Sequence, residues 1–468
     1  MKGKAILLLT GCCLISFGVL AAPPSVGNKV VLSHDNQKQI AAKAKEVSKV
    51  EKAKSTTENK AEEDEFYDLK GKSSAKQERF SADEEENTQK KKKVKKPELP
   101  KDKVATLERS LAMLTENIDN PAPIHYWFDR ISLRGLLNAD LNYQTKPEFT
   151  KSRSTQIMLS TVKLNIDAIA NSWITAHVGI FYATDPAKYY LAANSTGVDL
   201  EEGYITVANL AKLPFYFRVG KQYVSFGLYH RYPILRPLTQ ILSETQVTAA
   251  QIGFVDISGL YGTIYVFNGV AQMNHTDRDR LNNSGFMLGY ENLNNPLGVN
   301  IGFGYLTNMS DVGAIKNDLL NNYYDDRTHG LSAHLNLIAG PFDFALRYVS
   351  ALQRFATRDF AYRHTSGVRR GAKPRASTIK AGYAFKTKGH DSKFILSYQW
   401  TREAYNMSNT ATITSKLPIN RMSIAYGINL LKNFLLSAEL DRDHDYPAKR
   451  GGTNKYNNIA TIRMTVLI

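Results

Sequence analysis

The most regular feature of the chain is an alternation of apolar and polar residues. From Ile131 to Tyr143 the odd positions are apolar or glycine, and most even positions carry Ser, Arg, Asn or Asp. From Ala460 to Ile468 the even positions are apolar, and Arg463 stands among the odd ones. A period of two places the two sets on opposite faces of a β-strand. Both stretches are therefore predicted to be strands with one apolar and one polar face.

Similar stretches, with Trp, Tyr and Phe near their ends, fill the last three quarters of the chain. Sixteen strands are predicted, near residues 131–143, 156–168, 173–183, 200–210, 215–224, 246–255, 260–268, 284–291, 297–306, 328–338, 342–353, 377–386, 393–403, 419–429, 434–442 and 457–468. No run of residues after position 22 is apolar and long enough for a transmembrane helix. Alternating strands can still cross a bilayer, because their polar faces line a lumen.

The connections between these strands alternate in length. The long ones run near 144–155, 184–199, 225–245, 269–283, 307–327, 354–376, 404–418 and 443–456, and the connections between them are short. Transmembrane barrels have short periplasmic turns, long external loops and an even number of strands, each about 9–11 residues long. The pattern over residues 124–468 therefore predicts an all-β membrane protein. Its fold would be a sixteen-stranded antiparallel barrel in the bacterial outer membrane, in contact with lipid and lipopolysaccharide.

The first 22 residues have the composition of a targeting segment. A positive start, an apolar run and the small-residue pattern Val19-Leu20-Ala21 predict a cleaved signal peptide. A lipoprotein signal is one alternative, because Leu9-Thr10-Gly11-Cys12 fits a lipidation box. An uncleaved inner-membrane anchor is another. Cys12 and Cys13 are the only cysteines, so ordinary cleavage would leave a mature chain without disulfides or thiol chemistry.

Two further segments precede the barrel. Residues 23–103 are rich in Lys, Glu, Ala and Ser with almost no aromatics, which predicts a charged low-complexity periplasmic segment. It could bind an anionic surface or serve as a solvated linker. Residues 104–120 have apolar side chains in a 3-4-3-4 spacing, which is typical of a short coiled-coil-like helix. This helix either docks on neighbouring protein or joins copies of the chain into a homo-oligomer through 104–118.

The predicted barrel interior carries charges of both signs. Sixteen strands leave a water-filled lumen, and the formal net charge of the chain is +16. The basic residues predicted to face the lumen, as candidate ligand-contacting residues, are Arg134, Lys163, Arg218, Arg347, Lys380, Lys393, Arg421 and Arg463. Asp140, Asp167, Asp343 and Glu439 are predicted to join them. This wall either serves hydration alone or favours anionic solutes, since rings of Lys and Arg select anions.

Two external loops are candidates for contact with a solute. The 354–375 loop holds seven basic residues and one acid, Asp359, and guanidinium groups bind carboxylates and phosphates in a bidentate manner. Its candidate capture residues are Arg354, Arg358, Arg363, Arg369, Arg370 and Arg375. They could equally adhere to lipopolysaccharide. The 225–245 loop, with Arg231 and Arg236, is the candidate for folding inward and constricting the pore.

Signals for catalysis are absent from the sequence. The chain has no Gly-x-Ser-x-Gly, His-Glu-x-x-His or Walker motif, and its ten histidines show no ligand spacing. His177 and His334 are expected to be polar lumen residues rather than metal ligands. We therefore expect no enzymatic activity, no cofactor, no metal and no nucleic-acid partner. Residues 23–123 are also too polar to form the folded plug of a ligand-gated transporter.

Several phrases of the barrel resemble the LbtU-like siderophore porins, a family typified by the legiobactin receptor. These phrases are EEGYITVANLAKLPFYFRVGKQYVSFGLY (201–229), PLTQILSET (237–245), GLYGTIYVFNG (259–269) and GFGYLTNMSD (302–311), in the same order. The resemblance covers about 124–468. It implies a sixteen-stranded barrel that admits a ferric siderophore of the polycarboxylate type without a plug. It carries over no ligand residues.

Two features depart from the family pattern, and two other functions stay open. Ile468 stands where such barrels usually end on an aromatic residue, and the arginine-rich loop is not a family feature, so the ligand could differ. A general anion-preferring porin is the first alternative to siderophore uptake. A structural or adhesive outer-membrane barrel is the second.

Overall fold

The computed structural model describes only part of the chain, which divides into Met1–Val94 and Lys95–Ile468. Within the second unit it describes residues 103, 125–128, 130–149, 151–183, 198–227, 234–273, 281–292, 296–316, 319, 323–363, 369–404 and 417–468. The predicted signal peptide and charged segment lie outside these residues, except Lys103. The predicted 104–120 helix lies outside them entirely.

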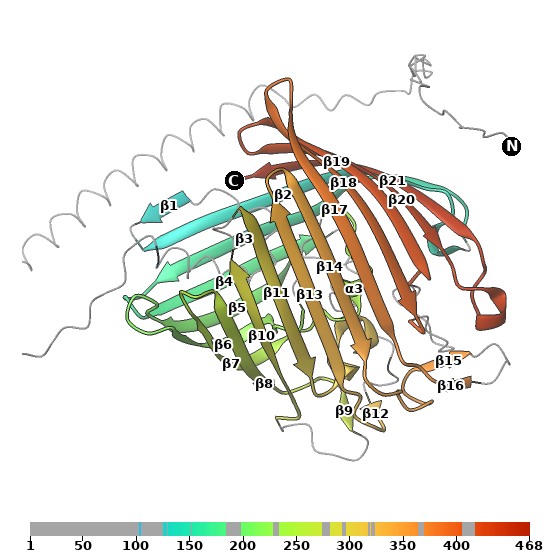
Figure 1. Ribbon diagram of the computed structural model, residues 1–468, viewed down its shortest axis with the longest axis horizontal. Helices are drawn as coiled ribbons and strands as arrows, with labels where there is room; N and C mark the ends of the chain where they lie inside the picture. Colours follow the sequence, from blue (N-terminus) through green and yellow to red (C-terminus); the bar gives the residue numbers. More distant parts are fainter. Residues whose placement is uncertain are drawn as a thin grey trace, which may run out of the picture. The chain divides into compact units, whose positions relative to one another are not determined.

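Sixteen antiparallel strands form a closed barrel (Figure 1). They are β2 (Ile131–Gln144), β3 (Ser154–Ile169), β4 (Ile174–Ala183), β5 (Val198–Ala208), β6 (Phe215–Tyr223), β7 (Gln246–Val255), β8 (Leu260–Phe267), β10 (Asn283–Asn292), β11 (Leu297–Leu306), β13 (Gly330–Ala339), β14 (Phe342–Ala351), β17 (Arg375–Thr387), β18 (His390–Arg402), β19 (Asn420–Leu431), β20 (Phe434–His444) and β21 (Tyr456–Leu467). Each strand pairs with the next, and β21 pairs with β2. The predicted fold class is confirmed, and every predicted strand is present.

The barrel closes through a continuous ladder between its first and last strands. Leu136 to Gln144 of β2 pair with Leu467 to Ile459 of β21. Beyond the ladder, Gly135 and Ile468 exchange two backbone hydrogen bonds, 2.7 and 2.9 Å long. A Cβ on Gly135 would lie only 3.1 Å from the Cβ of Ile468. The last residue thus continues the seam, and its side chain lies against a position that carries none.

The two faces of β21 differ as the alternation predicts. Ile462 and Met464 are 47% and 48% exposed, whereas Thr461 and Thr465 are 2% and 5% exposed. Apolar side chains therefore point out of the barrel, where hydrocarbon replaces water as the solvent. Polar side chains point into the lumen.

The connections also follow the predicted alternation. The β13–β14 and β17–β18 turns contain two residues each, whereas the β11–β13 and β14–β17 connections exceed twenty. Lys388 and Gly389 both have positive φ, 50° and 87°, which matches the twist of a two-residue hairpin. The short strand pairs β9 (Gln272–Met273) with β12 (Tyr323–Tyr324) and β15 (Ala361–Arg363) with β16 (Arg369–Gly371) lie at the long-loop end (Figure 1).

Two small features complete the fold. The four-residue strand β1 (His125–Phe128) pairs with β2 beside the closed ring. No helix among the described residues is long and apolar enough to span a membrane.

Candidate functional site: the lumen and its inward loop

The connection between β6 and β7 folds into the barrel. Its described part includes the one-turn helix α3 (Leu238–Ile241), which contacts β14, β17 and β18 (Figure 1). Leu238, Ile241 and Leu242 are almost fully buried in a cluster with wall residues such as Val349. A loop that starts at one side of the barrel therefore packs against the opposite wall.

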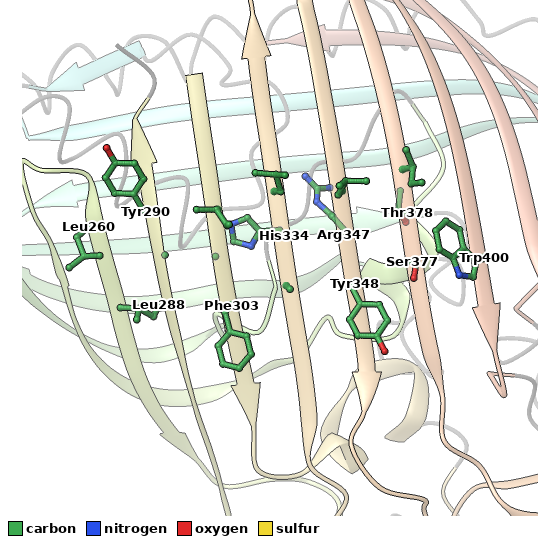
Figure 2. Close-up of a pocket in the computed structure, with 17 residues that line it drawn as sticks. Leu260, Leu288, Tyr290, Phe303, His334, Arg347, Tyr348, Ser377, Thr378 and Trp400 are labelled. Carbon is green, nitrogen blue, oxygen red and sulfur yellow. The ribbon is translucent and has the colours of Figure 1, made fainter. Parts of the chain in front are cut away.

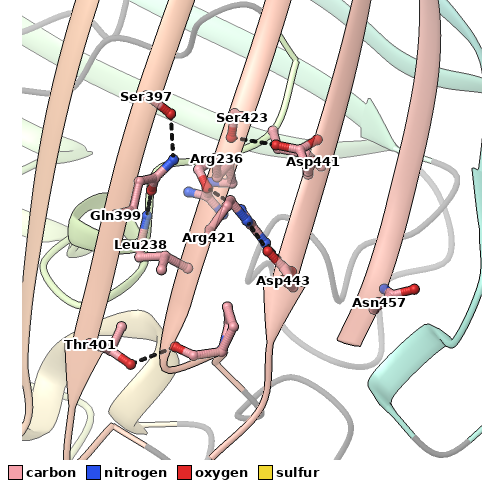
Figure 3. Close-up of polar contacts among 12 residues, drawn as sticks. Arg236, Leu238, Ser397, Gln399, Thr401, Arg421, Ser423, Asp441, Asp443 and Asn457 are labelled. Atoms are coloured by element: carbon pink, nitrogen blue, oxygen red, sulfur yellow. Dashed lines mark hydrogen bonds and ion pairs between the residues drawn. The ribbon is translucent and has the colours of Figure 1, made fainter. Parts of the chain in front are cut away.

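The opposite wall holds this loop by its backbone. Glu439 of β20 accepts hydrogen bonds from the amides of Ile234 and Leu235, at 2.7 and 3.1 Å. Gln399 of β18 accepts one from the amide of Leu238 at 2.8 Å (Figure 3). Backbone amides lack solvent partners inside a packed region, so these side chains satisfy groups that would otherwise be costly to bury.

Two further contacts extend the attachment to β17 and β19. The hydroxyl groups of Thr239 and Thr378 lie 3.1 Å apart. Arg421 donates to the carbonyl oxygen of Arg236 at 3.2 Å and forms a bidentate pair with Asp443, at 2.7 and 2.8 Å (Figure 3). Four consecutive strands, β17 to β20, thus fix the loop.

The two arginines predicted for this loop have different outcomes. Arg231 lies outside the described residues. Arg236 is 6% exposed and forms an ion pair with Glu244, which Gln240 also contacts. Arg236 therefore stabilises the loop from within rather than lining an open passage.

The eight predicted lumen cations all contact polar or aromatic groups of the barrel. Those paired with acids are Arg134 with Asp167 (2.8 Å), Lys163 with Glu201 (2.8 Å), Lys393 and Lys380 with Asp343 (2.7 and 3.5 Å), Arg421 with Asp443, and Arg463 with Asp140 (2.7 Å). Arg218 donates to Thr206 at 3.0 Å and lies over the Tyr204 ring at 4.1 Å, and Arg347 donates to Asn336 at 3.1 Å. The wall cations thus form local pairs rather than one ring.

Four acids of the wall were missing from the sequence interpretation. Glu201 and Glu202 are 4% and 2% exposed, and Asp441 and Asp443 are 4% and 5% exposed. The four predicted acids and these four together match the eight predicted cations in number. The alternation of β20 places Asp441 and Asp443 on the face of Glu439, so this signal was available. At Glu201 and Glu202 the ladder with β4 shifts register between Gly179 and Ile180, and no single period identifies both as inward.

The predicted lumen histidines lie in hydrogen-bonded networks. His177 contacts Asp167 at 2.7 Å and stacks on Tyr204, with the ring centroids 4.7 Å apart. His334 contacts Asn300 at 3.0 Å and Tyr261 at 3.2 Å. Across the described part of the chain, no group of three or more His, Cys, Asp or Glu side chains is placed to hold a metal ion.

The arginine-rich external loop is partly neutralised by its neighbour. Glu403, just after β18, pairs with Arg354 at 2.6 Å and lies 3.8 Å from Arg370. It also accepts the amide of Lys373 at 2.9 Å. Although burial opposes ionisation, these donors lower the pKa of Glu403. The carboxylate of Glu403 therefore remains charged and interacts with two of the candidate capture residues, Arg354 and Arg370.

The other predicted capture residues are dispersed. Arg358 is exposed, and the described backbones of Arg363 and Arg369 pair with each other in the β15–β16 hairpin. Arg375 is the first residue of β17 rather than part of the loop. The structure thus brings Arg354 and Arg370 together around Glu403 but does not gather all six residues into one cluster.

Comparison with known sequences finds relatives in Coxiella and Legionella. No family model matches the chain. A UPF0422 protein of Coxiella burnetii is 28% identical over 336 residues, which is 69% of this chain and 67% of that protein. The UPF0422 protein lpl2888 of Legionella pneumophila (strain Lens) is 24% identical over 329 residues, or 65% of this chain. The chain spans only 59% of the Legionella protein's length.

Solved structures show the same fold. OmpF of Salmonella typhi, in a complex with daunomycin, superposes with a TM-score of 0.50 at 13% identity. The match covers 74% of this chain and all of OmpF. At this identity the likeness concerns the fold alone. The chain is similar to UPF0422 proteins and forms a porin-like β-barrel.

Proposed function

We propose that this protein is an outer-membrane channel for small hydrophilic solutes, constricted by the loop between β6 and β7. The observation that carries this proposal is the attachment of residues 234–239 to four strands of the opposite wall. A segment tied across a lumen reduces its free cross-section. Paired charges line the remaining passage, and such a wall stays hydrated without binding one solute tightly.

The cargo that we infer is a ferric siderophore of the polycarboxylate type. The order of the phrases shared with LbtU-like siderophore porins supports this cargo, and so do the arginines of the 354–375 segment. The described lumen offers weaker support, because its basic residues are matched by acids. Selectivity for an anionic chelate would therefore reside mainly in the external loops.

Iron uptake at limiting chelate tests the cargo. A strain that lacks the protein should take up radioactive iron from ferric citrate, used as a polycarboxylate probe, several-fold more slowly than its parent. Uptake should return with the wild-type gene. Equal uptake in both strains would exclude this cargo but leave the channel itself intact.

A general porin is the second candidate, favoured by the charge balance of the wall. Purified protein in planar bilayers should then show stable conductance that ferric citrate does not block. The reversal potential in a potassium chloride gradient reports selectivity directly. A barrel with a purely structural or adhesive role would show no conductance in this experiment.

A further inference from the structure

An apolar groove crosses the outer surface of the barrel. It has a volume of about 680 Å³ and is lined by residues of β8, β10, β11, β13, β14, β17 and β18. Near the external end Ser377 lies between Tyr348 and Trp400 on neighbouring strands, as Figure 2 shows. The small side chain between two large rings leaves a depression. Trp400 is 37% exposed, so the depression opens toward the membrane.

Two arginines stand directly above this depression. Arg375 precedes Ser377 by two residues and Arg402 follows Trp400 by two, so both face outward with them. They are also direct partners across the β17–β18 ladder. Side chains at such positions have Cβ atoms about 5 Å apart, and like charges there are destabilising. Among the described residues no acid forms an ion pair with either arginine.

This arrangement is unlike that of the lumen charges. The lumen arginines have protein partners, whereas these two face outward at the membrane boundary. Aromatic girdles mark that boundary in outer-membrane barrels, and Tyr348 and Trp400 stand there. A like-charged pair in this place calls for an anion from outside the protein. Guanidinium groups bind phosphate in a bidentate manner.

We propose that Arg375 and Arg402 bind a phosphate of a phosphorylated, acylated lipid of the outer leaflet, with an acyl chain in the groove below. The long loops define the external side, so the site belongs to the outer leaflet. Charge complementarity selects the phosphate, and the apolar depression continues toward the bilayer interior, where acyl chains lie. A free phosphate would use the arginines but not the groove.

Retention of lipid A by the purified full-length chain tests the site. Native mass spectrometry in detergent should show wild-type protein holding lipid A, and R375Q/R402Q should weaken the apparent affinity at least about tenfold, as for loss of one charge-assisted contact. R442Q is the matched control. Arg442 is also an arginine near the external end of its strand, but it stacks on Tyr456 at 4.4 Å, so its loss should change nothing.

A second variant separates the groove from the arginines. S377F keeps both guanidinium groups and fills the depression, and it should also weaken lipid A binding severalfold. Heat-modifiable electrophoretic mobility verifies that each variant is folded. Unchanged binding in R375Q/R402Q would overturn the site. Unchanged binding in S377F, or full displacement of lipid A by inorganic phosphate, would show an anion site without a lipid. Dimers that form through this face in lipid-free detergent would assign it to a second copy instead.

Discussion

A carboxylate oxygen of Glu439 accepts a hydrogen bond of 2.7 Å from the backbone amide of Ile234 across the lumen. The amide of Leu235 donates to the same oxygen. One side chain of β20 thus satisfies two consecutive amides of a segment more than 200 residues earlier in the chain. Glu439 is therefore one of the anchors of the inward loop.

Replacing this anchor should loosen the loop without preventing barrel assembly. We expect E439A to cost about 1–3 kcal/mol of local stability, because the change leaves buried amides unsatisfied. The loop should then leave the opposite wall more often. Single-channel recordings should show larger conductance and more flicker than wild type.

Another acid of the lumen wall provides a control for this change. Asp343 of β14 pairs with Lys393 and Lys380, at 2.7 and 3.5 Å, and removing its charge changes the net charge by the same amount. D343N should therefore leave the loop in place and the flicker unchanged. If E439A and D343N behave alike, the anchoring role of Glu439 is wrong.

The lipid face of the closing strand should reject charge. M464R places a guanidinium group at a 48% exposed, outward position, and near the bilayer midplane it should cost roughly 2–4 kcal/mol. M464L keeps the apolar character and should cost little. Equilibrium unfolding from lipid vesicles in denaturant measures both. Equal stability of the two variants would reverse the assignment of faces, in which Arg463 points inward to Asp140.

The barrel could be predicted from the sequence because its information is local. Alternation within each strand shows which side chains face outward and which face the lumen. The loop lengths show which ends of the strands carry the long loops and which carry the short turns. The partners of individual charges are different, because Arg463 meets Asp140 only after 323 residues of chain have closed the ring. No strand-level pattern identifies such pairs. β-Bulges are also not identified by a strand-level pattern. The bulge at Glu201 brings an additional carboxylate to the lumen.

The external loops show the same limit more clearly. The arginines of the 354–375 segment look unopposed in sequence, because their counter-charge, Glu403, lies in another connection. Only the adjacency of β17 and β18 brings them together. The sequence therefore overstated the free positive charge at this end of the barrel.

Removing Glu403 should restore part of that charge. E403Q leaves Arg354 and Arg370 without their shared carboxylate, so the mouth becomes more positive at little steric cost. We expect the reversal potential in a potassium chloride gradient to shift toward chloride, more at low salt than at high salt because of screening. D326N, which neutralises an exposed acid of the β11–β13 connection, is the comparison. A shift of the same size in D326N would show that only net charge matters.

The external loops should also respond to pH through Asp359. This carboxylate is 7% exposed and accepts the backbone amide of Asp325, at 2.9 and 3.0 Å. Burial, together with the charges of Asp325 and Asp326, raises the pKa of Asp359 to about 6. The folded state therefore binds more protons than the unfolded state between about pH 4 and pH 6, and stability falls as pH rises through this window.

This pH dependence predicts a local opening at neutral pH. Hydrogen exchange at the amide of Asp325 should be better protected at pH 4.5 than at pH 7, after correction for the intrinsic exchange rate. D359N cannot ionise, so its protection should be the same at both values. Amides of the β2–β21 seam provide the internal reference, because no such carboxylate holds them. If protection at Asp325 in the wild-type protein does not change with pH, Asp359 keeps one protonation state between pH 4.5 and pH 7, and the predicted pH dependence is wrong.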